Sequence, residues 1–333
     1  MILGFALTEH CNLRCPHCIR DDVTNVKWLE RQLIERLVDE ALSLYGSVLV
    51  SFTGGEPLLH PDFYELAAAM SRRRVPYRFV TNGWHWRRIA LLARNCPPQS
   101  VRLSLSGALE STHDAERGRG SFRRLLTSAA VLTRYRVPFA LSLVVDRRSR
   151  EEITAAADLA EALGAFAVHY ILPQPTPPTA ARGSDLAPEE WWQVKDAIRT
   201  LEASSSRYTR LLIDYGYPFE GPEELCQTFA LRRIYVDTRG RLCTCCQLSN
   251  YGLNQKEVVA DLHEVTLTEG YALYLNRLRE LFQASRPKPH CPEITDPFPC
   301  LRCARASGKL GWLSRFPQSP WHQAAVETAP GTR

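Results

Sequence analysis

Three closely spaced cysteines near the start of the chain are the residues best suited to chemistry. They lie in Cys11-Asn-Leu-Arg-Cys15-Pro-His-Cys18, directly after the apolar run Ile2-Leu-Gly-Phe-Ala-Leu7. Iron–sulfur clusters are normally held by four cysteines. Three thiolates on a short loop can hold three irons of a [4Fe–4S] cluster and leave the fourth open to a small molecule, which favours chemistry over storage. The alternative is a zinc knuckle or free thiols, but zinc sites usually pair C-x2-C with a second pair.

A glycine-rich turn, Thr53-Gly-Gly-Glu56-Pro57, closes the second apolar run of the chain. Gly54 and Gly55 allow the backbone to approach a ligand closely and to adopt positive φ. Glu56 can accept a hydrogen bond from an ammonium group. Alone, this turn is not specific, and its value comes from its position after the cysteine loop.

The cysteine loop and this turn together resemble the radical S-adenosylmethionine (radical SAM) superfamily. The resemblance implies that Cys11, Cys15 and Cys18 bind a [4Fe–4S] cluster whose open iron binds the amino and carboxylate groups of SAM. An electron from the cluster would cleave SAM, and the resulting 5′-deoxyadenosyl radical would remove a hydrogen atom from the substrate. The cofactor supplies this chemistry, and the protein supplies position and electrostatics. An electron donor such as flavodoxin or ferredoxin is implied as a partner.

The resemblance also implies SAM contacts at the ends of several strands. The glycine turn would hold the amino group, the segment around Ser104 and Ser106 the ribose or carboxylate, and the backbone near Val144 the adenine. The branch of the superfamily with a C-terminal cysteine-rich extension often has Asp where Ser106 stands, so the role of that carboxylate does not transfer. The expected cofactor-binding residues are His17, Gly54, Gly55, Glu56, Pro57, Thr81, Asn82, Ser104, Ser106, Arg117 and Val144. For Arg117, a salt-bridged loop is the alternative.

A second group of seven cysteines lies between residues 226 and 303. Its pattern C…G-x4-C…C-x2-C resembles the SPASM and shorter twitch extensions of radical SAM enzymes. Because the denser cysteine run of a full SPASM domain is absent, the resemblance implies one auxiliary [4Fe–4S] cluster. Its expected ligands are Cys226, Cys245, Cys300 and Cys303. A zinc site with four cysteines is the alternative, because spacing alone does not separate the two metals.

Cys243, Cys246 and Cys291 remain unassigned. Cys243 and Cys245 are expected on one face of a strand, with Cys246 on the other. Cys243 or Cys246 could replace a cluster ligand. Either could also be catalytic and return a hydrogen atom to a substrate radical, which inverts the carbon centre. The alternative is that these are inert, buried thiols.

The elements that must position these residues alternate along the first half of the chain. Expected strands cover 2–8, 48–53, 77–81, 101–105, 139–145 and 166–171, and amphipathic helices cover 29–45, 61–74, 85–94, 121–135 and 150–163. Continuous apolar runs are typical of parallel strands buried on both faces. We therefore predict an α/β fold, a partial (β/α)6 TIM-like barrel with function at the C-terminal strand ends. A small cysteine-rich α+β extension follows it.

The composition changes at Leu172-Pro-Gln-Pro-Thr-Pro-Pro-Thr179, which is expected to be an extended linker or an active-site loop because proline interrupts helices and central strands. A helix is expected over 188–201 and another over 266–283, with a strand at 210–214 and a hairpin near Arg239-Gly240. We predict a radical SAM barrel (1–172), a Pro-rich linker with helix and strand (173–225), an auxiliary cluster domain (226–305) and a tail (306–333) that is partly disordered or packs over the barrel mouth.

Composition and charge bound the function. The 333 residues are 45% hydrophobic with a net charge of +5, which is ordinary for a globular protein and predicts no nucleic-acid partner. No apolar stretch approaches the roughly 20 residues of a membrane span, so no membrane association is expected. Clustered cysteines favour metal sites in a reducing cytoplasm over secreted disulfides.

The expected substrate is a small polar natural-product intermediate such as a sugar, aminocyclitol or nucleoside, because the chain begins at the first strand with no domain to capture a leader peptide. Epimerisation with a cysteine as hydrogen donor, or dehydrogenation, is the expected reaction. One alternative is epimerisation, oxidation or crosslinking of a ribosomal peptide. Another is a non-catalytic iron–sulfur protein, which the intact cysteine loop disfavours.

Overall fold

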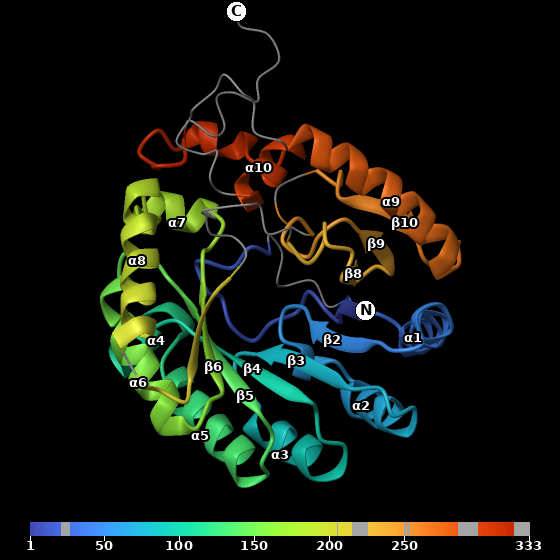
Figure 1. The fold of residues 1–333 in the computed structure, drawn as a ribbon, viewed down its shortest axis with the longest axis horizontal. Helices are drawn as coiled ribbons and strands as arrows, with labels where there is room; N and C mark the ends of the chain where they lie inside the picture. Colours follow the sequence, from blue (N-terminus) through green and yellow to red (C-terminus); the bar gives the residue numbers. More distant parts are fainter. Residues whose placement is uncertain are drawn as a thin grey trace, which may run out of the picture.

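The computed structural model describes residues 1–20, 27–204, 206–214, 226–249, 251, 254–285 and 299–322. Within these ranges one ten-stranded sheet runs in the order β10-β9-β8-β1-β2-β3-β4-β5-β6-β7 (Figure 1). The strands are β1 (Ile2–Ala6), β2 (Leu49–Thr53), β3 (Tyr77–Thr81), β4 (Ser100–Leu105), β5 (Phe139–Val144), β6 (Ala167–Ile171), β7 (Arg210–Ile213), β8 (Arg233–Val236), β9 (Arg241–Cys243) and β10 (Val258–Asp261).

The strands from β1 to β7 pair in parallel in chain order, and helices connect them. Figure 1 shows these helices on the outside of a curved, open sheet. This confirms the predicted α/β architecture of a partial TIM-like barrel. The connecting helices are α1 (Arg31–Tyr45), α2 (Phe63–Arg72), α3 (Trp86–Asn95), α4 (Glu110–Arg117), α5 (Ser121–Arg134) and α6 (Ile153–Leu163).

The two faces of the sheet differ in burial. Along β4, Val101, Leu103 and Leu105 are buried in the hydrophobic core beneath the helices, whereas Arg102 and Ser104 are partly exposed. Successive side chains of a strand point to opposite faces, so Arg102 and Ser104 face the inside of the barrel. The apolar core therefore lies between sheet and helices, and the inner face is partly polar.

The C-terminal region extends the same sheet, which the sequence did not reveal. β8 pairs in parallel with β1, from Ile2 opposite Arg233 to Phe5 opposite Val236, and β9 and β10 add antiparallel strands. The expected hairpin forms between β8 and β9, where Gly240 has a φ of +72°. β1, the strand that leads into the first cysteine loop, is thus an interior strand with partners on both sides.

The proline-rich segment is not extended throughout. Helix α7 (Pro177–Arg182) begins within it, so the expectation for 177–179 is wrong. Proline suits the first turn of a helix, where no N–H is needed, and Thr176 caps this turn by accepting a hydrogen bond from the N–H of Thr179. The helices expected after it are confirmed as α8 (Pro188–Ser204) and α9 (Leu267–Ala284), and α10 (Pro299–Ala306) carries the last two cysteines.

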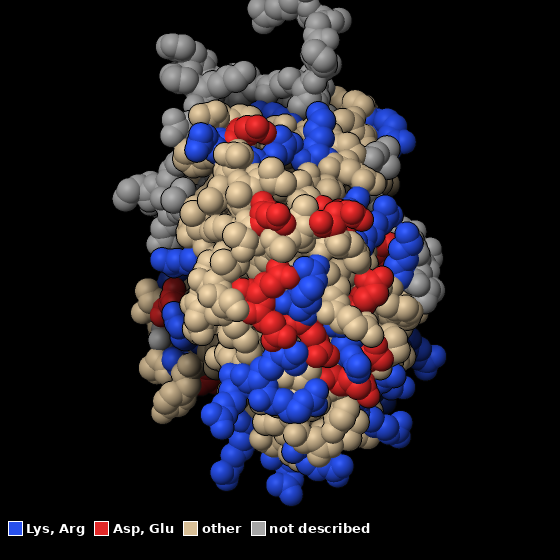
Figure 2. All heavy atoms as spheres, turned by 90° about the vertical axis from the view of Figure 1, so that its right-hand side faces the viewer, with Lys and Arg blue, Asp and Glu red and all other residues tan. Residues whose placement is uncertain are grey.

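Figure 2 faces the side of α1, α2 and α9, where acidic side chains form a band and basic ones gather below it. Ion pairs join the two signs; Arg73, for example, contacts Glu35 at 3.0 Å and Asp39 at 2.8 Å. In the part of the chain that the structure describes, no helix is long and apolar enough to cross a lipid bilayer.

Candidate functional site

The three cysteines of the first loop line one cavity of about 470 Å³ at the C-terminal end of β1. The opposite wall comes from segments distant in sequence, and the hydroxyl of Thr176 donates to the carbonyl of Pro16 at 2.8 Å, which fixes α7 to the loop. The cavity is lined by Cys11, Leu13, Arg14, Cys15, Pro16, Cys18, Arg20, Gly55, Thr176, Pro177, Pro178, Arg182, Tyr251, Trp312 and Arg315. The tail around Trp312 therefore reaches the barrel mouth.

The chemistry of these donors fits an iron–sulfur cluster. Burial raises the pKa of Cys11 to about 11 and raises that of Cys15, against the opposing charge of Arg117. A metal must displace such protons, and soft thiolates favour iron–sulfur clusters among other soft metal centres. Within the described ranges, no three His, Cys, Asp or Glu side chains converge on a single ion. The thiols instead share a cavity, which suits a larger group.

Gly54 has a φ of +142°, which confirms the positive φ predicted for this turn, and both glycines also allow a close approach to the chain itself. The N–H of Gly55 donates to the carbonyl of Thr8 at 2.7 Å, and the N–H of Glu56 donates to that of His10 at 2.9 Å. A Cβ added at Gly55 would lie 2.2 Å from the His10 carbonyl oxygen, and one at Gly54 would lie 2.5 Å from that of Thr8. The turn thus packs directly on the segment that leads into the cysteine loop.

Glu56 is buried and links the ends of β2 and β3. Its carboxylate accepts from the hydroxyl of Thr81 and the N–H of Asn82, both at 2.8 Å, and from the N–H of Leu58 at 3.1 Å. Burial raises the pKa of Glu56 to about 7 although these bonds oppose it. Pro57 directly follows as the first residue of a short 3-10 turn. Binding of an ammonium group by Glu56 stays a prediction.

Asn82 extends this link to the cysteine loop. Its side-chain amide donates to the amide oxygen of Asn12 at 3.0 Å and lies 3.9 Å from the sulfur of Cys11. The amide oxygen accepts from the N–H of Trp84 at 2.9 Å, which fixes the orientation. Asn82 therefore positions the loop that carries Cys11.

Helix α4 brings Arg117 to the end of β4. Its Nε donates to the hydroxyl of Ser106 at 2.6 Å, and both side chains are buried. Within the described chain Arg117 has no carboxylate partner, so the salt-bridged loop does not describe it. Asp114 is structural, because it accepts from the N–H groups of Gly120 and Phe122 at the start of α5. Ser104 lies two residues before Ser106, within β4, and faces the barrel interior.

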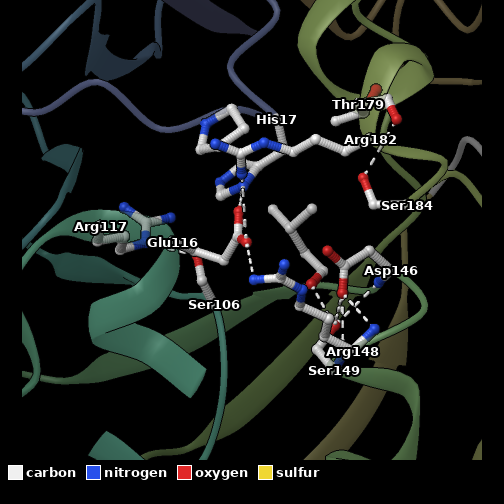
Figure 3. Close-up of polar contacts among 12 residues, drawn as sticks. His17, Ser106, Glu116, Arg117, Asp146, Arg148, Ser149, Thr179, Arg182 and Ser184 are labelled. Carbon is white, nitrogen blue, oxygen red and sulfur yellow. Dashed lines mark hydrogen bonds and ion pairs between the residues drawn. The ribbon is translucent and has the colours of Figure 1, made fainter. Parts of the chain in front are cut away.

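His17 lies against a charged cluster that the sequence analysis missed (Figure 3). Its Nδ1 is 3.7 Å from Glu116, which also contacts Arg148 at 3.1 Å and Arg182 at 3.8 Å. Burial lowers the pKa of His17, so the ring is neutral and the two arginines balance Glu116. The expected adenine contact at Val144 stays a prediction; its carbonyl accepts from Ser149 at 2.9 Å.

The second cysteine group is also brought together. Burial, together with the thiols of Cys303 and Cys226, raises the pKa of Cys300 well above its usual value. Cys245 is likewise influenced by Cys246 and Cys300. The four expected ligands therefore lie within electrostatic range of one another, although they come from the segment before β8, the turn after β9 and α10. Cys291 lies outside the described residues.

The two candidates for the hydrogen donor are not equivalent. Strand β9 ends at Cys243, so the expectation that Cys243 and Cys245 share a strand face is wrong. Cys243 is fully buried in a small cluster with Ala6 and Tyr235. Cys246 lies beside Cys245, accepts from Arg233 at 3.6 Å, and has its pKa lowered to about 6 by the hydrogen bond from Cys245 and the charge of Arg233.

Arg20 connects the two cysteine groups and was not predicted. Its Nε donates to the carbonyl of Gly54 at 2.8 Å, and its Nη2 donates to the hydroxyl of Tyr235 on β8 at 3.0 Å. Despite burial, Tyr235 and the thiols of Cys18 and Cys246 raise the pKa of Arg20. A basic residue two positions after the third cysteine was the only signal in the sequence.

Comparison with known proteins agrees with this geometry. Residues 5–160 match the Radical SAM superfamily. An AdoMet-dependent heme synthase of Methanosarcina barkeri is 34% identical over 53% of this chain and 51% of its own length. The PqqA peptide cyclase of Gluconobacter oxydans is 26% identical over 93% of this chain and 84% of its own. SuiB of Streptococcus suis, bound to precursor peptide SuiA, superposes with a TM-score of 0.70 at 14% identity, covering 96% of this chain and 73% of SuiB.

The barrel with its three-cysteine loop is thus a radical SAM domain, and the family predicted from the sequence is confirmed over residues 5–160. The family uses SAM and a [4Fe–4S] cluster, and the cavity at the first loop carries the thiols for such a cluster. The chain spans 39–55% of the length of several curated relatives that it matches.

Proposed function

We propose that the chain is a radical SAM enzyme that modifies a peptide. The observation that carries the chemistry is the shared cavity of Cys11, Cys15 and Cys18 beside Gly55. The peptide substrate is supported by similarity to the PqqA peptide cyclase over most of both chains and by the fold of SuiB, which was solved with a precursor peptide. These similarities favour a peptide over the small polar metabolite that the sequence analysis put first.

In this proposal, the three thiolates hold the cluster and the surrounding side chains hold SAM. Bound there, the cluster and SAM supply a 5′-deoxyadenosyl radical. Asn82 and Glu56 fix the loop, Arg117 offers a buried positive charge to the SAM carboxylate, and neutral His17 offers an aromatic face to the adenine. Arg182, Trp312 and the first turn of α7 line the cavity, and we expect them to limit the access of water.

The second group would hold one auxiliary [4Fe–4S] cluster through Cys226, Cys245, Cys300 and Cys303. Their mutual electrostatic influence supports this set, as does the partial burial of Cys300 and Cys303 on α10. Metal analysis after anaerobic reconstitution should give about eight irons per chain and no zinc, because each cube holds four. About four irons together with one zinc would instead assign this group to zinc.

The activity is tested with reconstituted protein, SAM, a reductant and synthetic peptides encoded beside the gene. We expect formation of 5′-deoxyadenosine and a mass change in one peptide. Cys15→Ala should abolish both, since it removes a cluster ligand. Cys96→Ala is the matched control, because Cys96 is buried outside both cysteine groups. Absence of 5′-deoxyadenosine from the wild-type protein with a full iron content would contradict the proposal.

A second candidate concerns how the reaction ends. Cys246 is the thiol beside Arg20 and Arg233, both of which face the same interior, and this favours Cys246 over Cys243 as hydrogen donor. An epimerised residue in the peptide would then carry solvent deuterium after reaction in deuterium oxide. Cys246→Ala should still form 5′-deoxyadenosine but no deuterated product. Unchanged product from Cys246→Ala would exclude thiol donation and favour an oxidation or a crosslink.

A further inference from the structure

The inner face of the barrel carries an unusual concentration of positive charge. Arg78 on β3, Arg102 on β4 and Arg233 on β8 all face inward, since their neighbours Phe79, Leu103 and Ile234 belong to the outer core. All three arginines are partly exposed, whereas those outward neighbours are fully or almost fully buried. The interior beside them is therefore accessible, and it is lined by guanidinium groups.

Among the described residues, none of these arginines contacts a carboxylate. Nε of Arg78 donates to the hydroxyl of Ser51 at 3.3 Å, Nη2 of Arg102 lies 3.1 Å from Nε2 of His169, and Arg233 reaches Cys246. In the described ranges no ion pair joins any of the three to a carboxylate. Asp214 acts on Arg102 and Arg233 only at longer range.

Unpartnered polar atoms mark the same interior. Ser142 on β5 is 3% exposed, and its hydroxyl has no hydrogen-bond partner among the described residues. It lies between Ser104 and His169 in the register of the sheet, so it faces the same side as Arg102. Nε of Arg233 and Nη1 of Arg20 are likewise buried without a partner in the described chain. Buried polar groups are normally satisfied, so these donors point to a ligand.

The electrostatics of this inner face, which Arg78, Arg102 and Arg233 line, also favour an anionic ligand. Burial and the positive charges of Arg233 and Arg102 lower the pKa of Arg78 to about 10. Burial, with the charges of Arg102, Arg78 and Arg210, lowers the pKa of His169 to about 3, so the ring is neutral and adds no charge. Like charges in a poorly solvated space repel each other, and an entering anion would relieve that repulsion.

This inner face is adjacent to the cavity of the first cysteine loop. Arg20 lines the cavity of the first cysteine loop and also bonds to Tyr235 on β8, next to the strand position of Arg233. Arg233, two residues before Tyr235 on β8, lies 3.6 Å from the sulfur of Cys246, so Arg20 and Arg233 both border the space beside the second cysteine group. An anion held here would lie between the two cysteine groups.

We propose that Arg78, Arg102 and Arg233, with Ser142, bind a carboxylate of the substrate inside the barrel. The proposal rests on the proposed function in that the carboxylate belongs to a peptide, either as an acidic side chain or as the C-terminus. Guanidinium groups suit carboxylates because their donors match both oxygens. The arginines would hold the peptide in place while a neighbouring carbon faces the radical site.

Three small probes separate the sources of the carboxylate. N-acetyl-glutamic acid α-amide carries only a side-chain carboxylate, N-acetyl-alanine carries only a C-terminal one, and N-acetyl-glutamine amide is a neutral control. Dissociation constants are obtained from the shift of the thermal unfolding midpoint of the reconstituted protein with probe concentration, since a ligand that binds the native state stabilises it. We expect at least one acidic probe to bind and the neutral probe to have no effect.

Arg102→Gln and Arg78→Gln should each weaken binding of that acidic probe about tenfold or more, because each removes charge-assisted hydrogen bonds. Arg123→Gln is the matched control, since the Arg123 side chain is 80% exposed on the outside of α5. Without probe, the two interior variants should unfold at the same or a higher temperature than wild type, because repulsion is relieved. A purely structural arginine would instead lower the midpoint.

The proposal is overturned if neither acidic probe binds, if the neutral probe binds equally well, or if the interior variants bind the acidic probes like wild type. The acidic probe that binds more tightly identifies the peptide group. Because this measurement needs no turnover, failure of 5′-deoxyadenosine formation would count against the proposed function without affecting the anion site. Probe binding with an unmodified peptide would keep the site and reject the peptide chemistry.

Discussion

At the scale of single residues, substitution of Arg117 or Ser106 gives the most direct test of where SAM binds. Arg117→Gln should weaken SAM binding about tenfold, because it removes a buried charge and a hydrogen bond of 2.6 Å at the end of β4. Equilibrium dialysis of SAM against the reconstituted protein measures this. Arg119→Gln is the control, since Arg119 is exposed two residues away. Ser106→Ala should have a smaller effect that does not add to that of Arg117→Gln, and unchanged affinity in Arg117→Gln would remove Arg117 from the site.

Asp185 predicts a dependence of stability on pH. It is buried, one carboxylate oxygen has no partner in the described chain, and burial raises its pKa to about 6 from 3.8. The folded protein therefore holds this proton more tightly than the unfolded chain, so the stabilisation is present below the unfolded pKa and is lost as pH rises through the folded one. Between about pH 5 and 7, wild type should lose about 1 kcal/mol of unfolding free energy relative to Asp185→Asn. If the unfolding free energies of wild type and Asp185→Asn, measured in urea, changed equally with pH over this range, the assignment to Asp185 would be wrong.

At the scale of elements, α7 shows how a short helix can protect a site. Thr176 caps α7 and also donates to Pro16 in the cysteine loop. Thr176→Ala should cost about 1–2 kcal/mol of unfolding free energy and speed the loss of cluster absorbance in air, because the wall of the cavity loosens. Thr266 provides the control, since it forms the same capping box on α9 without touching the loop. Thr266→Ala should lower stability in urea but leave cluster loss unchanged; equal cluster loss in both variants would show that α7 is no barrier.

The elements also show what the sequence could predict. Strands β1 to β6 follow from apolar runs with glycine and proline between them, because local pattern and burial agree there. Helix α4 was missed because Glu110–Arg117 is polar and its buried face carries His113, Glu116 and Arg117 in place of apolar residues. Those side chains are buried for the site, so a hydrophobic pattern could not reveal the helix.

Only the site residues that lie close together in the sequence could be predicted to share a site. Cys11, Cys15 and Cys18 lie within one loop, and their shared cavity follows from their sequence. The three inward-facing arginines could not be foreseen, because Arg78, Arg102 and Arg233 come from three strands that only the order and curvature of the sheet bring near one another. Each alone reads as a basic residue in a strand, and only the register shows that all three face inward.

At the scale of the whole molecule, the pairing of β8 with β1 ties the two cysteine groups into one sheet. β1 leads into the first cysteine loop, β9 ends at Cys243 of the second group, and β8 lies between these two strands. A displacement of β8 would therefore move Arg233 and Tyr235 relative to Arg20. The predicted boundary at residues 225 and 226 separates two stretches of sequence that share one sheet.

This topology predicts that residues 1–225 do not fold alone. Truncation after residue 225 exposes one edge of β1 and removes the fully buried side chains of Ile234, Val236 and Leu242. Each such side chain contributes about 1.5–3 kcal/mol, so losing several approaches the roughly 5–15 kcal/mol that holds a protein together. An unpaired interior strand also invites edge-to-edge association. Expressed alone, residues 1–225 should aggregate, whereas an Arg333 deletion should behave as wild type in size-exclusion chromatography. A monomeric 1–225 fragment with cooperative unfolding would mean that the barrel is stable without β8, and that β8 serves to place the second cysteine group.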